Sequence, residues 1–227
     1  MADREAEAAL RRHLERRLPD HAVAGEEYGG EIRTERPVWC IDPIDGTKAF
    51  VTGRPTFGLA VALVVDGEPV LGLVDQPVLG DRWIAARGHG LRWNGRPVRA
   101  RACAGLGDAV ASATSPEMFL DTPLEPFYRT LCRRVRFFVY GGDCVGYALM
   151  ASGFSDLVVE ADLKPFDFLP LVPIVEEAGG LFTDLSGRRP DPAASGVAVV
   201  AAGDRRVHAA VLELAAGLVR PAAPPAP

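Results

Sequence analysis

The first half of the chain contains a succession of short apolar segments separated by turn residues. Apolar residues dominate positions 57–65 and 70–75, and the sequence DGEP between them is typical of a tight hairpin turn. Shorter segments of the same kind, RWIAA, LRW and RPVRA, follow after further glycine-containing turns. Strands joined by such short turns pair in antiparallel fashion. The pattern therefore predicts an amphipathic helix at residues 5–18 and, after it, an antiparallel sheet.

The pattern changes near Gly105, where strands begin to alternate with helices. The strand-like segments AVASAT, VRFFVY and DLVVE are separated by segments with helical periodicity near residues 123–132 and 143–151. Alternation of this kind indicates an α/β arrangement. We therefore expect an α+β domain over residues 1–105 and an α/β domain over residues 106–227, with a disordered tail rich in proline and alanine.

Composition and charge limit the classes of function. The chain has 227 residues and a formal net charge of -5, so no basic surface for nucleic acid is indicated. The longest apolar run is too short to cross a bilayer, and the first residues lack the apolar core of a signal peptide. The four cysteines form no CxxC pair, which favours reduced thiols. We expect a cytoplasmic protein with a small-molecule substrate and neither a nucleic-acid nor a membrane partner.

The sequence WCIDPIDGTKAF places two carboxylates directly after a buried strand. The proline between them favours an extended backbone, so the carboxylates of Asp42 and Asp45 can converge with the Ile44 carbonyl between them. Oxygen ligands of this kind suit Mg2+. Gly46 allows close approach of a ligand, and Thr47 opens a helix whose N–H groups can face a phosphate. A turn followed by a capped helix explains the same residues without any ligand.

Three further acidic segments allow both a structural and a functional interpretation. Glu26 and Glu27 form a pair of the kind that usually faces water. Asp143 in YGGDC and Asp167 in KPFDF each stand at the start of a predicted helix, where an aspartate either caps the helix or binds a ligand. Pro173 should kink the helix that follows Asp167 or shift its start.

Together these segments resemble the inositol monophosphatase-like family of metal-dependent phosphatases. The family's GEE loop, its WxxDPIDGTxxF motif and a later aspartate opening a helix that ends in EAGG all occur here in order, over about residues 2–216. The segments GGDC and DLKP resemble the histidinol-phosphate phosphatase branch. The resemblance implies a layered αβαβα sugar-phosphatase fold and a homodimer. It also implies a helix and a hairpin before ADRE, which this chain is expected to lack.

The resemblance further implies a role for each acidic motif, together with two or three Mg2+ ions and inhibition by Li+. Metal ligands would be Glu26, Asp42, the Ile44 carbonyl, Asp45 and Asp167. Phosphate would be bound by Asp45, Gly46 and Thr47. Glu26, Thr47 and Asp3 would be catalytic, with Asp3 and Thr47 orienting the attacking water. The substrate's leaving group would contact Gly142, Asp143 and Glu160.

These motifs predict a Mg2+-dependent phosphomonoesterase that hydrolyses L-histidinol phosphate in histidine biosynthesis. Hydrolysis of inositol 1-monophosphate and a nucleotide 3'-phosphatase activity are alternatives. An alternative of another class is a catalytically weak remnant that binds metal, which the short N-terminus suggests. Retention of all four predicted carboxylate ligands argues against a remnant, because buried carboxylates without partners are costly.

Overall fold

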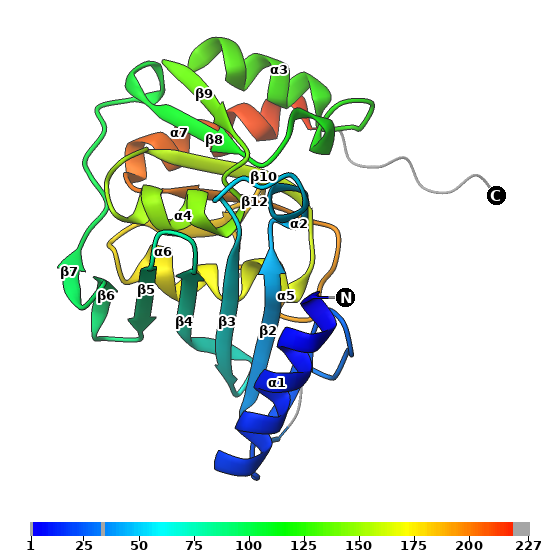
Figure 1. Cartoon of the computed structure of the whole chain (residues 1–227). Coiled ribbons are helices and arrows are strands. Elements are labelled where there is room, and N and C mark those ends of the chain that lie inside the picture. Colours follow the sequence, from blue (N-terminus) through cyan, green and yellow to red (C-terminus); the bar gives the residue numbers. More distant parts are fainter. Residues whose placement is uncertain (1, 33–34, 220–227) are drawn as a thin grey trace.

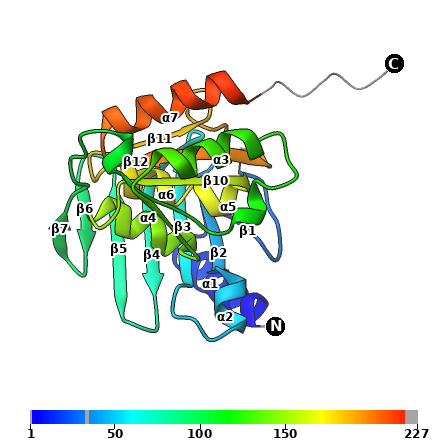
Figure 2. The same cartoon turned by 90° about the horizontal axis from the view of Figure 1, so that it is seen from above.

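The computed structural model describes residues 2–32 and 35–219, and in this part of the chain two β-sheets alternate with three layers of helix (Figure 1). Helix α1 (Ala2–Arg17) covers β1 and β2 of the first sheet. Helix α4 (Asp143–Ala151) and helix α6 (Leu171–Glu176) contact strands of both sheets and form the central layer. Helix α3 (Glu125–Arg134) and helix α7 (Arg205–Leu218) pack together over the second sheet (Figure 2). The order of layers is therefore αβαβα, as predicted.

The first sheet follows the order of the chain. Its strands are β1 (Ala22–Gly25), β2 (Val38–Asp45), β3 (Gly58–Val65), β4 (Glu68–Gln76), β5 (Asp81–Ala86), β6 (Gly90–Trp93) and β7 (Arg96–Val98). Strands β2 to β7 pair in antiparallel fashion, which confirms the predicted meander. The strand pattern did not indicate β1, which pairs with β2 in parallel. A turn at EEYGG follows β1 directly and is closed by a bridge between Gly25 and Gly29.

The second sheet is mixed and has the order β11-β12-β10-β8-β9. Its strands are β8 (Val110–Ala113), β9 (Phe137–Tyr140), β10 (Leu157–Leu163), β11 (Leu181–Asp184) and β12 (Val197–Ala202). Strand β8 pairs in parallel with β9 and β10, whereas β12 pairs in antiparallel fashion with β10 and β11. The change of sequence pattern near Gly105 coincides with the passage of the chain from the first sheet to the second.

The helix expected after Asp167 is divided in two. Helix α5 (Pro165–Phe168) ends before Pro170, which is the residue that precedes α6. Pro173 lies in the first turn of α6, where a missing backbone N–H removes no helical hydrogen bond. The helix therefore starts later, at Leu171, which is one of the two outcomes expected for Pro173. The last helix begins directly after Asp204, whose Oδ1 accepts a hydrogen bond of 2.8 Å from the Arg206 N–H.

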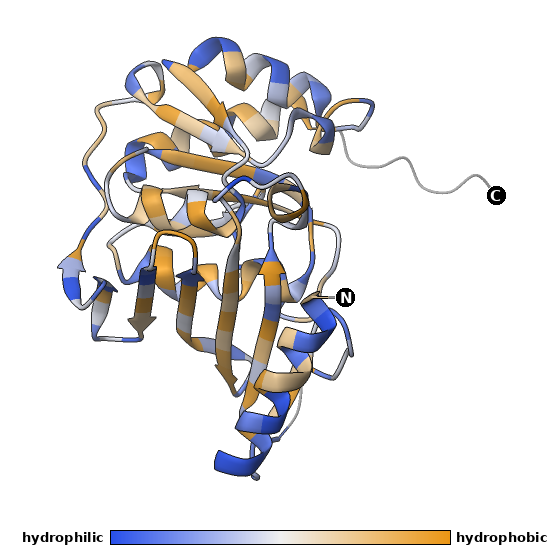
Figure 3. Cartoon of the chain, viewed as in Figure 1, coloured by the Kyte–Doolittle hydropathy of each residue, from blue (hydrophilic) through white to orange (hydrophobic). Residues whose placement is uncertain are grey.

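Two apolar clusters hold the layers together. The first lies around the central helices and includes Tyr147, Phe168 and Ile174, all fully buried. The second lies between the five-stranded sheet and the outer helices and includes Leu131 and Val211. Figure 3 shows apolar residues concentrated on the central helices and strands, whereas α1 and α3 carry long hydrophilic stretches. Burial of these faces fixes the central helices between the sheets, and α4 and α5 carry site residues there.

Two further expectations concern composition. All four cysteines are free thiols, as their spacing predicted. None of the helices in residues 2–32 and 35–219 combines the length and the apolar character needed to cross a membrane.

The outer core generates a stability prediction. Leu131 of α3 is completely buried in the outer apolar cluster, so Leu131→Ala should lower the free energy of unfolding by about 2–5 kcal/mol, measured by urea denaturation. The exposed neighbour Arg133 provides the control, and Arg133→Ala should change stability by less than about 0.5 kcal/mol. Equal effects of the two substitutions would contradict the described packing of the outer helices.

Candidate active site

The junction between β2 and α2 (Thr47–Val51) carries two of the predicted metal ligands. The pairing of β2 with β3 is irregular between Asp42 and Asp45, at the proline that cannot donate to a sheet. The Ile44 N–H donates instead to Oδ1 of Asp42, at 3.0 Å. Gly46 then adopts a left-handed conformation with φ 88°, which turns the chain directly from the strand into α2. This local geometry aims both carboxylates away from the strand axis toward α5.

Asp167 reaches the same place from the second half of the chain. It is the third residue of α5, and its Oδ2 accepts a hydrogen bond of 2.7 Å from the Lys164 N–H that precedes the helix. The capping interpretation is therefore correct for one oxygen of Asp167. It does not exclude a ligand role, because α5 packs against β2 and brings the same carboxylate beside the DPIDGT segment.

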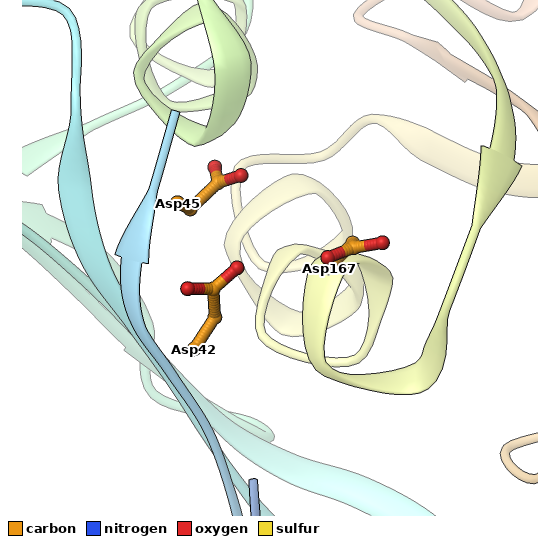
Figure 4. A group of neighbouring side chains, drawn as sticks. All are labelled: Asp42, Asp45 and Asp167. Atoms are coloured by element: carbon orange, nitrogen blue, oxygen red, sulfur yellow. The ribbon is translucent and has the colours of Figure 1, made fainter. Parts of the chain in front are cut away.

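Asp42, Asp45 and Asp167 form a compact group of carboxylates. One oxygen from each lies within 4.8 Å of the others, and the side chains surround a common space (Figure 4). Asp42 is buried, and the other two are partly accessible. Anionic oxygen atoms at this spacing are the donor set that a hard divalent cation such as Mg2+ prefers, so the residues present fit the predicted metal.

The electrostatic environment of this group disfavours three negative charges without a cation. Burial, followed by the charges of Asp45, Glu26 and Asp167, raises the pKa of Asp42 to about 10. Burial is also the main cause that raises the pKa of Asp167 to about 6. The pKa of Asp45 lies well above its ordinary value because of burial and the charge of Asp143. A bound divalent cation would compensate these charges and favour the ionised carboxylates.

Glu26 and Asp3 lie at the edge of the group. Burial raises the pKa of Glu26, while a hydrogen bond with Asp42 opposes the increase and the charge of Asp3 adds to it. Glu26 is thus a neighbour of Asp42, although it is not one of the three carboxylates whose oxygens lie within 4.8 Å. Asp3 belongs to the first turn of α1, which begins at Ala2. Thr47 Oγ1 donates to the Ile44 carbonyl at 3.3 Å.

A second set of acidic side chains, Asp143 of α4 and Glu160 of β10, faces this group and is called the second acidic wall below. Asp143 opens α4, and the next residue along, Cys144, donates its backbone N–H to Oδ2 of Asp45 at 2.5 Å. Glu160 is only 5% exposed within β10. Thr114 joins the two acids, since its hydroxyl lies 3.2 Å from Oδ1 of Asp143 and 2.6 Å from Oε1 of Glu160.

The capping interpretation of Asp143 is wrong. Asp143 does not cap α4, because the capping position is Gly142 and no side chain there accepts a helical N–H. Asp143 instead has φ 43°, an uncommon conformation for a residue other than glycine. Glu160 is not a solvated strand end, since it is buried and accepts a hydrogen bond of 3.0 Å from the Tyr147 hydroxyl.

The sequence motifs did not reveal Thr114 and Tyr147. Thr114 follows β8, 46 residues before its partner Glu160, and a threonine after a strand carries no local sign of such a contact. Tyr147 lies four residues after Asp143, one helical turn along the same face of α4. This spacing is the feature of the sequence that could have indicated that Tyr147 lies near the site.

The two acidic walls line one cavity of about 840 Å³. Predicted site residues in its lining are Asp45, Gly46, Thr47, Asp143, Glu160 and Asp167. Lys48 is the cationic side chain among the described residues that line it. The cavity therefore combines a group of carboxylates suited to divalent cations with a second, separate set of carboxylates, and it is large enough for a small organic molecule.

Comparison with known proteins identifies the family. The family model described as "Inositol monophosphatase family" matches residues 1–220. The chain belongs to the inositol monophosphatase family. The resemblance stated from the GEE, DPIDGT and EAGG motifs is thereby confirmed.

Individual relatives of the family are similar over most of this chain. It is 46% identical over 221 residues to the bifunctional phosphatase IMPL2, chloroplastic, of Arabidopsis thaliana, covering 94% of this chain and 64% of that protein. It thus spans less than two thirds of the length of that relative. The histidinol-phosphatase of Chlorobaculum parvum is 37% identical over 188 residues, which cover 83% of this chain and 73% of the relative.

Solved structures confirm the fold. An inositol monophosphatase from Zymomonas mobilis superposes with a TM-score of 0.86 and 40% sequence identity, covering 93% of this chain and 81% of that structure. An inositol monophosphatase from Anabaena (Nostoc) superposes with a TM-score of 0.87 at 25% identity, covering 96% of this chain and 86% of that structure. The predicted layered fold of the inositol monophosphatase family is therefore correct.

The raised pKa values of this family member generate a prediction about pH and metal. A carboxyl group whose pKa is higher in the folded than in the unfolded state contributes stability below its unfolded pKa, and that contribution is lost as the pH rises. The metal-free protein should therefore lose stability between pH 5 and pH 8, because Asp167 ionises near pH 6 and Asp42 near pH 10 in the fold. For each carboxyl group that is protonated in the folded protein and ionised in the unfolded chain, the free energy of unfolding falls by up to about 1.4 kcal/mol per pH unit.

Added Mg2+ should reverse this loss by binding the ionised carboxylates. The increase in melting temperature on adding Mg2+, measured by differential scanning fluorimetry, should be larger at pH 8 than at pH 5.5. Asp42→Asn should abolish most of the increase. An increase that is equal at both pH values would contradict metal binding by these carboxylates.

Proposed function

We propose that this chain is a Mg2+-dependent phosphomonoesterase that acts on a small phosphate ester. The observation that carries the proposal is the compact group of Asp42, Asp45 and Asp167, two of which, Asp45 and Asp167, line the same cavity as Asp143 and Glu160. The names of the relatives, which include histidinol-phosphatases and a bifunctional phosphatase, support the same reaction class. Hydrolysis of a phosphate monoester requires positioning and compensation of charge more than covalent catalysis by the protein.

The proposed ligands for two or three Mg2+ ions are Glu26, Asp42, the Ile44 carbonyl, Asp45 and Asp167. When bound, such ions neutralise phosphate charge and supply a Lewis acid. The chain's own contribution is to hold these oxygens in place before substrate arrives. Asp45 is fixed by the Cys144 N–H, Asp42 by the Ile44 N–H and Asp167 by the Lys164 N–H. Each of these contacts occupies one oxygen of the carboxylate.

Phosphate would lie at the start of α2. The backbone N–H groups of Gly46 and Thr47 are the proposed donors to its oxygens, since the first N–H groups of a helix have no partner within the helix. The Thr47 hydroxyl, already in contact with the Ile44 carbonyl, would orient the attacking water together with Asp3. These assignments follow the family pattern and agree with the position of Gly46 and Thr47 in the cavity lining.

The leaving group would face Asp143, Gly142 and Glu160. Hydrogen bonds to Glu160 come from the Thr114 hydroxyl and N–H and from the Tyr147 hydroxyl, so both of its oxygens already have donors. Burial raises the pKa of Glu160 to about 7, which weakens its negative charge near neutral pH. The Thr114 hydroxyl also lies 3.2 Å from Oδ1 of Asp143, but its one proton can be donated to only one of the two acids, and Glu160 is the nearer acceptor. Asp143 is therefore the carboxylate better suited to bind a cationic leaving group.

L-Histidinol phosphate is the substrate that this arrangement favours. Its leaving group carries an ammonium group and an imidazole, which form charge-assisted hydrogen bonds with a carboxylate. Several relatives, including proteins from Mycobacterium tuberculosis and Streptomyces coelicolor, are named histidinol-phosphatases. Inositol monophosphate is the second candidate, because a solved structure 40% identical to this chain is described as an inositol monophosphatase. Its leaving group is neutral, so it gains less from Asp143.

The substrate assignment is tested by phosphate release from both esters in the presence of Mg2+. Asp143→Asn should lower kcat/KM for histidinol phosphate roughly 10- to 100-fold, because a charge-assisted hydrogen bond worth about 1.5–3 kcal/mol is lost. The loss for inositol 1-phosphate should be much smaller. Asparagine tolerates the positive φ of this position, so the substitution leaves the backbone unstrained.

Asp66→Asn provides the matched control. Asp66 also has a positive φ, 52°, and it is exposed in the hairpin turn between β3 and β4, away from the cavity lining. Its substitution should leave both activities unchanged. Equal losses on both substrates in Asp143→Asn would assign Asp143 to structure, and faster turnover of inositol phosphate by the unmodified protein would overturn the histidinol assignment.

A further inference from the structure

Glu7 is a charged residue outside the cavity that the fold nevertheless buries completely. It lies on α1, is 0% exposed, and is the one residue of that helix that is buried. A carboxylate held out of water is costly unless donors surround it. The donors that surround Glu7 come from the turn that carries Glu26.

Each oxygen of Glu7 accepts a hydrogen bond from that turn. Oε2 accepts from the Glu27 N–H at 2.8 Å, and Oε1 accepts from the Tyr28 N–H at 3.3 Å. Oε1 also forms an ion pair of 2.8 Å with Nε of Arg11. The Glu7 carboxylate therefore binds the two backbone N–H groups that directly follow Glu26.

Arg11 holds the other side of the same turn. Its Nη1 donates to the Val23 carbonyl at 3.1 Å, and its Nη2 donates to the Gly29 carbonyl at 2.5 Å. Val23 precedes Glu26 in β1 and Gly29 follows it, so one guanidinium links the two ends of the turn. Glu7 and Arg11, one helical turn apart on α1, thus fix the turn as a pair.

Gly25 shows how closely the carboxylate approaches this turn. A Cβ added at Gly25 would lie 2.3 Å from Oε1 of Glu7, which is far shorter than any van der Waals contact. The buried carboxylate of Glu7 occupies the space that a side chain at position 25 would need. This explains why the first residue of the GEE motif is glycine. The next residue, Glu26, is anchored on its other side by its N–H, which donates to the Ile41 carbonyl of β2 at 3.2 Å.

We propose that Glu7 is a positioning residue for metal binding: by fixing the backbone of the turn that follows Gly25, it holds the Glu26 carboxylate beside Asp42. The inference rests on the proposed function, in which Glu26 is a metal ligand. Exposed contacts of the turn, such as the ion pair of Arg4 with Glu27, contribute little because solvent screens them. Glu7 and Arg11 supply the partly buried contacts that determine where Glu26 points.

Glu7→Gln is a precise test, because glutamine has the same shape. Both oxygens of Glu7 face N–H donors, so the amide NH2 of glutamine would meet a donor in either orientation. The turn should then shift, and the dissociation constant for Mn2+, used as a probe for Mg2+ in electron paramagnetic resonance titrations, should rise roughly 10- to 100-fold. Glu15→Gln, on the exposed surface of the same helix, is the control and should leave Mn2+ binding unchanged.

A double-mutant cycle separates positioning from a general structural role. Glu26→Gln removes the proposed ligand itself, so adding Glu7→Gln to it should weaken Mn2+ binding no further. Gly25→Ala provides an independent route to the same result if Glu7→Gln fails to fold, because the new methyl group would displace the Glu7 carboxylate. In the Glu26→Gln background it too should have no additional effect.

Additive losses in the cycle would overturn the inference, as would unchanged Mn2+ binding in a folded Glu7→Gln protein. Both readouts are independent of turnover. If the unmodified protein binds Mn2+ but releases no phosphate from either ester, the proposed function fails while the cycle still decides the role of Glu7.

Discussion

Mutual repulsion among Asp42, Asp45 and Asp167 is the constraint around which this fold is arranged. Three carboxylates with oxygens within 4.8 Å, one of them buried, destabilise a protein unless protons or a cation neutralise them. Lys48 is the cationic side chain in the described lining of the cavity and acts on Asp143, and the charge of Lys164 offsets only part of the effect of burial on Asp167. Apolar burial elsewhere in the fold offsets the cost of assembling the group, and a divalent cation bound there, as proposed, would reduce that cost further. Function and stability are linked through the same three side chains.

The layered architecture makes this assembly possible. Strand β2 of the first sheet supplies two carboxylates, α5 of the central layer supplies the third, and α4 and β10 supply the facing wall. The central helices contact both sheets, so their positions are fixed from two sides by apolar packing. Short backbone hydrogen bonds then orient each acid, as the Cys144 N–H does for Asp45. The positions of these acids are thus set by secondary structure on either side, and the turn at Glu26 has further contacts with Glu7 and Arg11 of α1.

Local sequence patterns predicted the parts of this arrangement that depend on neighbouring residues. The meander and the DPIDGT junction both follow from turn, cap and glycine preferences within a few positions. Contacts between distant segments left no such signal. The parallel pairing of β1, the bridge from Thr114 to Glu160 and the approach of Glu7 to Gly25 each join segments that meet only after the sheets form. Asp143 shows the limit of local patterns. Its position at a helix start suggested a helix cap, but in the fold its side chain contacts Thr114 from a distant segment.

The central claim is that the three carboxylates hold divalent cations. Crystals of the protein grown with Mn2+ would test it directly through anomalous diffraction at the manganese absorption edge. We expect at least one strong anomalous peak between Asp42, Asp45 and Asp167, at about 2.0–2.3 Å from their oxygens. The peak should disappear when crystals of Asp45→Asn are grown under the same conditions. Manganese found elsewhere, with none beside these three carboxylates, would contradict the account.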